Sequence, residues 1–193
     1  MKNLELRMKS SILVILLFLT CAVEAQVKMR DVISQMPDTL APALSKNNRL
    51  DCIDFLASNM KAEVNNMLGG KSELQRMTDN YAQFLLSDGL RMQLRLLDTN
   101  QEVDGARQLI CMVQTYGGDV RESVVRFFSV QWNELPAADF VKLPGEMFTA
   151  ELNEQSDGLT VTPSTYFDRP ATEEQQPVTK LSINLKWCEN IYK

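Results

Sequence analysis

The chain has 193 residues, of which 45% are hydrophobic and 23% are charged, and its formal net charge is −5. This hydrophobic fraction excludes wholesale disorder, and the length suits one domain with a real core, or one domain and a small annex. The acidic balance, without a long run of Lys or Arg, argues against a nucleic-acid binder. The chain contains no histidine, which removes the usual proton shuttle of hydrolases and the commonest zinc ligand.

The first 25 residues have the pattern of an export signal. Basic residues precede an apolar run over residues 11–23, and residues 23–25 place small side chains where a signal peptidase cleaves. The run is shorter than the roughly 20 residues that a membrane span needs. We therefore expect an exported protein, periplasmic or secreted, that begins at Gln26. The alternatives are an uncleaved anchor and lipidation at Cys21, and we expect membrane association only with the lipid.

Two helices are predicted at the start of the mature chain. The first covers residues 27–36, where the apolar spacing is helical and a proline follows; a short turn comes next, over residues 38–44. The second helix begins with Asn48 as its N-cap and ends at Gly69-Gly70, where a glycine supplies the left-handed residue. Its apolar stripe repeats in steps of three and four: Leu50, Ile53, Ala57, Met60, Val64 and Met67.

After the two glycines the pattern becomes strand-like. Residues 81–86 and 90–96 predict a hairpin around a Ser-Asp-Gly turn. Residues 108–116 and 121–131 predict a second hairpin around a Gly-Gly-Asp turn. The strand over residues 121–131 has apolar residues on both phases, so we expect it to be central and covered on both sides.

The rest of the chain gives weaker signals. Residues 134–144 are helical or irregular, while residues 159–162 and 178–187 predict later strands. Between these two strands we expect a mobile loop around 163–177. The prediction for residues 26–193 is therefore a single α+β domain, with N-terminal helices followed by an antiparallel β meander.

The Gly-Gly-Lys-Ser segment over residues 69–72 resembles the end of a phosphate-binding loop. Such a loop needs an earlier glycine where this chain has Asn65, and it needs a strand before it and a helix after it. The predicted order here is the reverse, a helix before and a strand after. We therefore expect no bound nucleotide.

Other catalytic or metal-binding patterns are incomplete. Ser58 and Lys61 have Ser-x-x-Lys spacing, but the companion Lys-Thr-Gly is missing, so a solvated helix face explains them better. Residues 98–105 carry side-chain oxygens, as a calcium loop does. Such a loop needs Gly at its sixth position and Glu at its twelfth, where this chain has Val103 and Leu109, so an acidic turn is favoured. Asp51 and Asp54 share one predicted helix, whereas glycosidase carboxylates face each other across a cleft. We assign no catalytic residue, no metal site and no cofactor.

The cysteines and large aromatic residues leave alternatives open. The mature chain keeps three cysteines, either as one bridge plus a free thiol or as three buried hydrophobes: Cys52, Cys111 and Cys188. Three aromatic residues could line a sugar or peptide groove, or pack in the core: Tyr116, Trp132 and Trp187.

Two segments carry a family resemblance: KNNRLDCIDFLASNMKAEVNNMLGGKSEL over residues 46–74, and RQLICMVQTYGGDVRESVVRFFSVQW over residues 107–132. The chain resembles a family of secreted proteins from anaerobic Gram-negative bacteria, catalogued only as domain of unknown function number 3256. The Asn-Asn-Arg-Leu-Asp and Gly-Gly-Lys-Ser segments are its most distinctive parts, and the likeness covers most of the mature chain. The resemblance implies export to the cell envelope or beyond, and it brings no catalytic residues.

The leading functional hypothesis is a non-enzymatic binding or interaction module of the cell envelope, whose partner is an envelope protein, a peptide or a glycan. We expect binding where the 46–72 segment meets the sheet, although the same residues could simply cap the helix and satisfy loop backbone. They are Asn47, Asn48, Arg49, Asp51, Asp54, Lys61, Lys71 and Ser72. One alternative is a hydrolase that acts on glycans or peptides through two carboxylates. Another is a structural component of an envelope assembly, with an exposed apolar patch or an open sheet edge.

Overall fold

The structure, a computed structural model, describes residues 26–163 and 181–193. The predicted export signal over residues 1–25 lies outside this part of the chain, and so does nearly all of the predicted loop around 163–177. In the described residues, helices come first and antiparallel strands follow, which confirms the α+β class. The strands dominate, and they form two sheets where one meander was predicted.

The first helix, α2 (Met29–Gln35), confirms the prediction for residues 27–36. The chain leaves helical geometry at Met36, because a residue before proline is pushed toward extended backbone. A 3-10 turn, η1 (Asp38–Leu40), follows. The buried side chains of α2 share one face: Met29, Val32 and Ile33.

The second helix, α3 (Lys46–Ala57), begins earlier than predicted and ends well before the two glycines. Its N-cap is Ser45, whose hydroxyl accepts the Asn48 N–H at 3.2 Å, so the prediction of Asn48 as the cap was wrong. The helix stops at Ala57, and Asn59 takes a left-handed φ of 57°. The apolar spacing beyond that point is coincidental, because Met60 and Met67 are 57% and 70% exposed.

The prediction that Gly69-Gly70 ends the second helix was also wrong. The two glycines belong to the turn between strands β1 (Glu63–Asn65) and β2 (Lys71–Met77). Gly69 does take a left-handed backbone conformation, with a φ of 81°, as predicted for a glycine here. It does so in a hairpin turn and not at the end of a helix. The Asn66 side-chain oxygen accepts the N–H groups of Leu68 and Gly70 at 3.0 and 2.9 Å, which fixes that turn.

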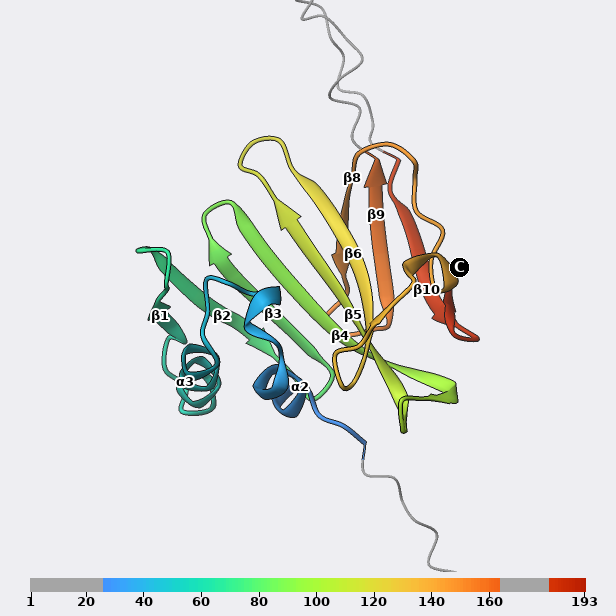
Figure 1. Cartoon of the computed structure of the whole chain (residues 1–193). Helices are drawn as coiled ribbons and strands as arrows, with labels where there is room; N and C mark the ends of the chain where they lie inside the picture. Colours follow the sequence, from blue (N-terminus) through green and yellow to red (C-terminus); the bar gives the residue numbers. More distant parts are fainter. Residues whose placement is uncertain (1–25, 164–180) are drawn as a thin grey trace, which may run out of the picture.

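The large sheet has seven strands, and each pairs antiparallel with the next one in the chain (Figure 1). Both predicted hairpins are present, as β3–β4 and β5–β6, while β1, β2 and β7 were not predicted. The strands after β2 are β3 (Tyr81–Ser87), β4 (Leu90–Val103), β5 (Ala106–Tyr116), β6 (Glu122–Ser129) and β7 (Glu134–Leu135). The chain then forms a 3-10 turn, η2 (Ala137–Asp139).

The second sheet has the order β11-β10-β9-β8 and was predicted only in part. The expected strands over residues 159–162 and 178–187 correspond to β9 and β10, and the other two strands were missed. Their bounds are β8 (Phe148–Leu152), β9 (Gly158–Pro163), β10 (Ile183–Cys188) and β11 (Ile191–Tyr192).

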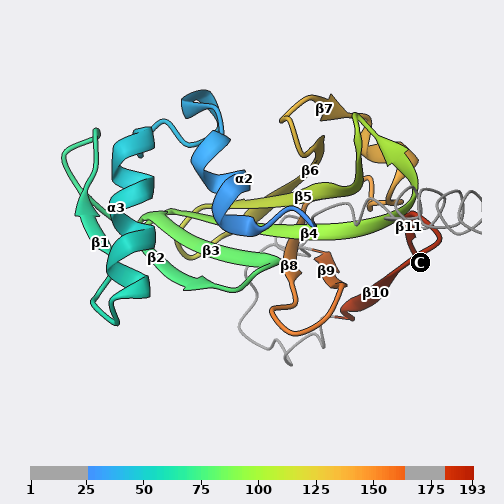
Figure 2. The ribbon, with the colours of Figure 1, turned by 90° about the horizontal axis from the view of Figure 1, so that it is seen from below.

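The large sheet is covered on both faces (Figure 2): α2 and α3 lie on one face, and the second sheet lies on the other. The side chains of β4 alternate between them, so that Met92 packs under the helices while Leu97 packs under the second sheet. In β6, Phe128 and Phe127 point to opposite cores in the same way, which confirms that this strand is covered on both sides. No helix in the described residues is long and apolar enough to cross a membrane.

Candidate functional site: a polar groove between the two sheets

The structure gives Arg49, a predicted surface donor, an internal role. Its side chain is fully buried, and the guanidinium donates hydrogen bonds to the backbone oxygens of Ile33, Met36 and Leu44. One Nη atom also pairs with the Asp38 carboxylate at 2.7 Å. Arg49 therefore satisfies the carbonyls at the end of α2 and joins that helix to α3.

The residues around the β1–β2 turn are also occupied by internal contacts. Ser72 is buried, and its hydroxyl donates to the Leu86 oxygen at 2.6 Å. Lys61 and Lys71 both bind the Glu63 carboxylate, and these hydrogen bonds, that of Lys61 first, lower the pKa of Glu63 to about 2. Lys71 and Ser72 begin a strand, so no helix N-terminus follows them to hold a phosphate.

The remaining predicted binding residues lie on α3. Asp54 pairs with Arg30 at 2.9 Å on the surface. Asn48 accepts a hydrogen bond from Ser45 and donates one to the Asn65 oxygen at 3.3 Å, while Asn47 and Asp51 are exposed. Five of the eight predicted residues thus lie in α3, Lys61 lies between α3 and β1, and Lys71 and Ser72 lie at the start of β2. Binding through them stays a prediction.

The three candidate groove aromatics are far apart in the fold. Trp132 is buried on the helix side and donates from Nε1 to the Val32 oxygen at 3.0 Å. Trp187 packs on the opposite side, where its ring lies 5.2 Å from that of Tyr192. Tyr116 is 43% exposed at the end of β5. They do not form one groove.

The remaining sequence patterns have structural roles. Ser58 is the C-cap of α3, and Lys61 pairs with a carboxylate, so the two do not form a nucleophile and base. The acidic turn predicted over residues 98–105 lies mostly in β4, and only Asp104 and Gly105 make the turn. Across residues 26–163 and 181–193, no three His, Cys, Asp or Glu side chains are grouped to hold a metal ion.

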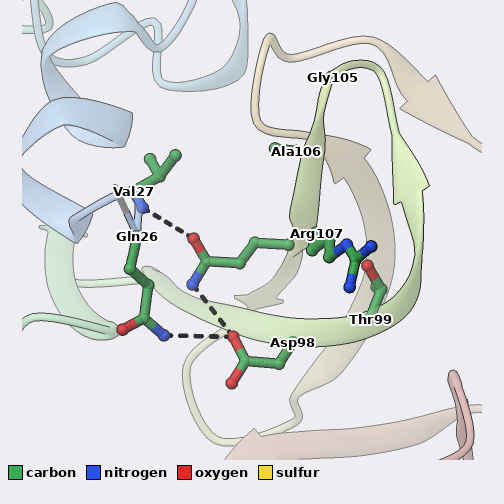
Figure 3. Close-up of a pocket in the computed structure, with 8 residues that line it drawn as sticks. Gln26, Val27, Asp98, Thr99, Gly105, Ala106 and Arg107 are labelled. Carbon is green, nitrogen blue, oxygen red and sulfur yellow. Dashed lines mark hydrogen bonds between the residues drawn. The ribbon is translucent and has the colours of Figure 1, made fainter. Parts of the chain in front are cut away.

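A cavity of about 550 Å³ lies near the turn of the β4–β5 hairpin, beside the start of the described chain (Figure 3). The Val27 N–H donates to Gln108 Oε1 at 2.8 Å, and Gln108 Nε2 donates to Asp98 Oδ1 at 3.2 Å. Gln26 Nε2 donates to the same carboxylate oxygen at 3.3 Å. Because these polar groups satisfy one another, we interpret the cavity as the place where the N-terminal segment is attached to the sheet.

Three smaller cavities follow one another and share lining residues: two lie where the second sheet meets the large sheet, and the third lies at the turns before β4 and β6. The first and second, of about 350 and 160 Å³, share Glu151 and Thr160. The second and third, of about 160 and 60 Å³, share Arg91, Thr115 and Arg121. We call this the interlayer groove. Its polar lining residues are Arg76, Tyr81, Gln83, Asp88, Arg91, Gln93, Thr115, Arg121, Thr149, Glu151, Asn153, Glu154, Thr160 and Thr162.

A chain of hydrogen bonds forms the floor of the groove. The N–H of Leu152 donates to Gln93 Oε1 at 3.1 Å, and Gln93 Nε2 donates to the Tyr81 hydroxyl at 2.9 Å. That hydroxyl donates to Gln83 Oε1 at 3.0 Å, and Gln83 Nε2 donates to Gln75 Oε1 at 2.8 Å. All four bonds run in one direction, from β8 to β2, so each polarises the next.

Side chains of the large sheet also bind the backbone of β8. The outward N–H of Ala150 donates to the Ser123 hydroxyl at 2.9 Å, as that of Leu152 does to Gln93. Arg95 pairs with Asp157 at 2.7 Å and donates to the Asn153 oxygen at 2.9 Å. The N–H groups of Ala150 and Leu152 are therefore unavailable to an added strand, which would need them for pairing.

The acidic residues of the groove do not form a catalytic pair. Among the described residues, Glu151 and Glu154 come from the same wall, in β8 and the turn after it. Asp88 comes from the large sheet but lines only the 60 Å³ part, which neither glutamate lines. The opposite wall supplies Arg76, which pairs with Glu154, together with Gln83. This arrangement offers hydrogen-bond donors and acceptors but lacks the opposed acid and base of a glycosidase.

The sequence did contain one sign of the groove. Thr160 and Thr162 alternate with buried Leu159 and Val161, so one face of β9 is polar. The alternation in β4 is typical of a half-buried strand, yet its polar residues Gln93 and Arg95 are 2% and 3% exposed, beneath the second sheet. Gln93 and Thr160 line the same cavity although they are distant in sequence, and no local pattern predicts that contact.

Residues 20–161 match the model of a family described as Protein of unknown function (DUF3256). The fold is similar to a solved structure titled "Structure of a domain of an uncharacterized protein from Porphyromonas gingivalis W83". That likeness has a TM-score of 0.70 and 16% sequence identity, and it covers 86% of this chain and 96% of the other. At this identity it shows a common fold alone. No curated protein matches the sequence significantly.

Proposed function

The chain belongs to the DUF3256 family, whose description states no activity, and from its own geometry we propose that it is a non-enzymatic binding module with a carbohydrate ligand. The ligand lies in the interlayer groove. The observation that carries the proposal is the lining itself, where hydroxyl and amide side chains from both sheets converge on an ordered floor.

Hydroxyl groups of a sugar both donate and accept hydrogen bonds, and so do the groups of the groove. Thr149 and Thr160 bring hydroxyls from the second sheet, while Gln83 brings an amide from the large sheet. The Thr160 hydroxyl donates its proton to Asn184 at 2.8 Å, so it can serve a ligand as an acceptor. The floor is pre-organised because Tyr81 and Gln93 are buried and hydrogen-bonded before any ligand arrives. Pre-organised polar groups lose little conformational entropy on binding, which favours affinity for a polar ligand.

An extended peptide is the competing ligand, and the edge of β8 argues against it. A peptide that added a strand there would need the N–H groups of Ala150 and Leu152, which already donate to Ser123 and Gln93. The groove also lacks the alternating apolar pockets that give such peptides their specificity.

Titration calorimetry of the purified protein against neutral, amino-sugar and acidic oligosaccharides, with a polar hexapeptide alongside, tests the proposal. We expect heat of binding from at least one oligosaccharide class. The double variant Thr149→Val/Thr160→Val should lose most of that affinity, because valine keeps the shape and removes both hydroxyls. The control is Thr78→Val, an exposed threonine outside the groove. Binding of the peptide alone, or an unchanged affinity in the double variant, would reject the proposal.

We also propose that the module acts outside the cytosol, in the cell envelope or beyond. This location rests on the export signal predicted over residues 1–25. N-terminal sequencing of the native protein should begin at Gln26. A native chain that began at Met1 in the cytosolic fraction would contradict this location without affecting the groove.

A further inference from the structure

Two arginines stand at one end of the interlayer groove, and neither has a carboxylate partner in the described residues. Arg91 is the second residue of β4, and Arg121 immediately precedes β6. Both line the 160 Å³ and 60 Å³ parts of the groove. Thr115 lies between them in the sheet, since it pairs with Arg91 on one side and with Ser123 on the other.

Among the arginines that the structure describes, these two are set apart by the absence of a carboxylate partner. In a chain with a net charge of −5, carboxylates are plentiful, and Arg107 also has a partner. Five other arginines form ion pairs: Arg30, Arg49, Arg76, Arg95 and Arg126. Within residues 26–163 and 181–193, the half-buried Arg91 guanidinium has no hydrogen bond at all, and Arg121 donates only from Nε to the Gly118 oxygen, at 3.1 Å. Several N–H donors are thus left facing one cavity.

The nearby acidic residues do not neutralise this pair. Asp88 lines the cavity of about 60 Å³ and Glu151 that of about 160 Å³, yet neither forms an ion pair with Arg91 or Arg121 in the described part of the chain. Arg91 is half-buried, so its guanidinium loses part of its solvation, which a bound oxyanion restores through charge-assisted hydrogen bonds. Arg121 is exposed and adds a second positive charge beside it.

Hydroxyl groups and a rigid turn complete the site. Thr115 Oγ1 lies 2.8 Å from Ser123 Oγ, so the hydroxyl beside the arginines is already oriented. The turn before Arg121 is fixed by Gly117, which has a φ of 105° and donates to the Gly89 oxygen at 2.9 Å. The backbone at Arg121 is therefore fixed before a ligand binds, and the bond from its Nε to the Gly118 oxygen restrains the side chain.

We infer that this end of the groove, around Arg91 and Arg121, is an oxyanion subsite, and that the ligand is an acidic oligosaccharide with a carboxylate or a sulfate ester. The inference rests on the proposed function, because it assigns the class of sugar to the same groove. Guanidinium groups with adjacent hydroxyls match the geometry of both anions. Two isolated arginines do not form the continuous basic stripe that a nucleic acid needs.

The experiment compares three probes of similar length: a neutral cello-oligosaccharide, an oligogalacturonate and a sulfated chondroitin oligosaccharide. Affinities are measured at low and moderate salt for the native protein, for Arg91→Gln/Arg121→Gln, and for Arg30→Gln. The last variant removes one positive charge on the helix side, where Arg30 pairs with Asp54. It is the charge-matched control for the single variants Arg91→Gln and Arg121→Gln, which are measured alongside the double variant.

We expect an acidic probe to bind about tenfold or more tightly than the neutral one, as charge-assisted hydrogen bonds would give. The double variant should lose that difference and its salt dependence, while Arg30→Gln keeps both. The carboxylated and sulfated probes show which oxyanion the subsite prefers. Thermal melts establish that each variant is folded. If the double variant does not fold, NMR titration of the native protein with the acidic probe should move the Arg91 and Arg121 Nε resonances instead.

The outcomes separate the two proposals. If neutral and acidic probes bind equally and the double variant changes nothing, the oxyanion subsite is wrong while the carbohydrate-binding function stands. If no oligosaccharide binds, both fail. If the acidic probe binds more tightly but moves neither arginine resonance in the native protein, the anion lies elsewhere and the assignment of the subsite is overturned.

Discussion

The side-chain oxygen of Gln93 accepts the backbone N–H of Leu152 at 3.1 Å, and this bond ties the edge of the second sheet to the middle of the large one. Gln93 is 2% exposed, and its amide nitrogen donates to Tyr81 as well. One amide therefore satisfies a backbone group on one side and a phenol on the other. The junction of the two sheets depends on polar contacts at this point, next to the apolar core around Phe127.

Replacing Gln93 with leucine should destabilise the protein by about 1–3 kcal/mol, because the buried Leu152 N–H loses its acceptor. Urea denaturation measures the change. Gln75→Leu is the matched control, since Gln75 is exposed at the other end of the same chain of hydrogen bonds and should change stability by less than about 0.5 kcal/mol. If both variants changed the free energy of unfolding equally, the hydrogen bond from the Leu152 N–H to Gln93 would have no stabilising effect of its own.

Arg49→Ala should be the most damaging of the changes considered, at about 3–5 kcal/mol, because it leaves several buried carbonyls without a donor. Arg49→Lys should recover only part of the loss, since lysine lacks the planar fork. Arg30→Ala, at an exposed ion pair, should cost less than about 1 kcal/mol. A mild effect of Arg49→Ala in chemical denaturation would show that α2 does not depend on this contact.

The turn before β6 provides a test of backbone strain. A Cβ atom on Gly117 would lie 2.0 Å from the Val120 oxygen, at a φ of 105° that other residues rarely adopt. Gly117→Ala should therefore cost about 1–3 kcal/mol. It should also weaken oligosaccharide binding through displacement of Arg121. Gly118→Ala has open space around the new Cβ and should behave like the native protein in thermal melts and titrations.

The three cysteines of the described residues form no disulfide with one another, and they should differ in thiol reactivity. Burial raises the pKa of the Cys52 thiol to about 11 and raises that of Cys111 further, so neither forms thiolate at pH 8. Iodoacetamide should label the exposed Cys188 in the native protein and label the other two only after unfolding. Peptide mass spectrometry identifies the labelled sites. Rapid native labelling of Cys52 or Cys111 would contradict the packing of the core.

Stability should fall as the pH rises above about 10. Burial raises the pKa of Tyr192 and, to a smaller extent, that of Tyr81, in the folded protein. The unfolded chain then ionises first, so the stabilising contribution is complete below the unfolded pKa and is lost above it. Urea midpoints between pH 8 and 11 measure this. Tyr192→Phe should flatten the decline and cost little at pH 8, because in the described residues the Tyr192 hydroxyl has only the Cys111 thiol, a weak hydrogen-bonding group, beside it.

Local patterns predicted the hairpins well because each depends on neighbouring residues. The alternation of Leu90, Met92 and Leu94 after a Ser-Asp-Gly turn was enough for β3–β4. The end of α3 was missed because Met60 and Met67 continue an apolar spacing that the fold does not bury. The left-handed Asn59 stops the helix, and nothing in the spacing reveals it.

The groove could not be predicted from sequence, because its walls come from strands that are distant in the chain. Arg91 and Thr160 meet only after β8 and β9 fold back across the large sheet. The sequence marked hydrophilic residues of α3 and the β1–β2 hairpin, where Arg49 and Ser72 turned out to be buried contacts. A motif search finds residues close in sequence, whereas this site is formed by two sheets that pack against each other.

The order of the large sheet has a consequence for how the protein assembles. Every strand from β1 to β7 lies beside the one made just before it, so the sheet can grow one hairpin at a time as the chain emerges. The β8–β11 layer has no such local route to its place, since β8 must first find Gln93 and Ser123 across the completed surface. Its docking is therefore the slow, late event of folding, and until it occurs the face of the sheet that carries Leu97 and Phe127 remains open to water.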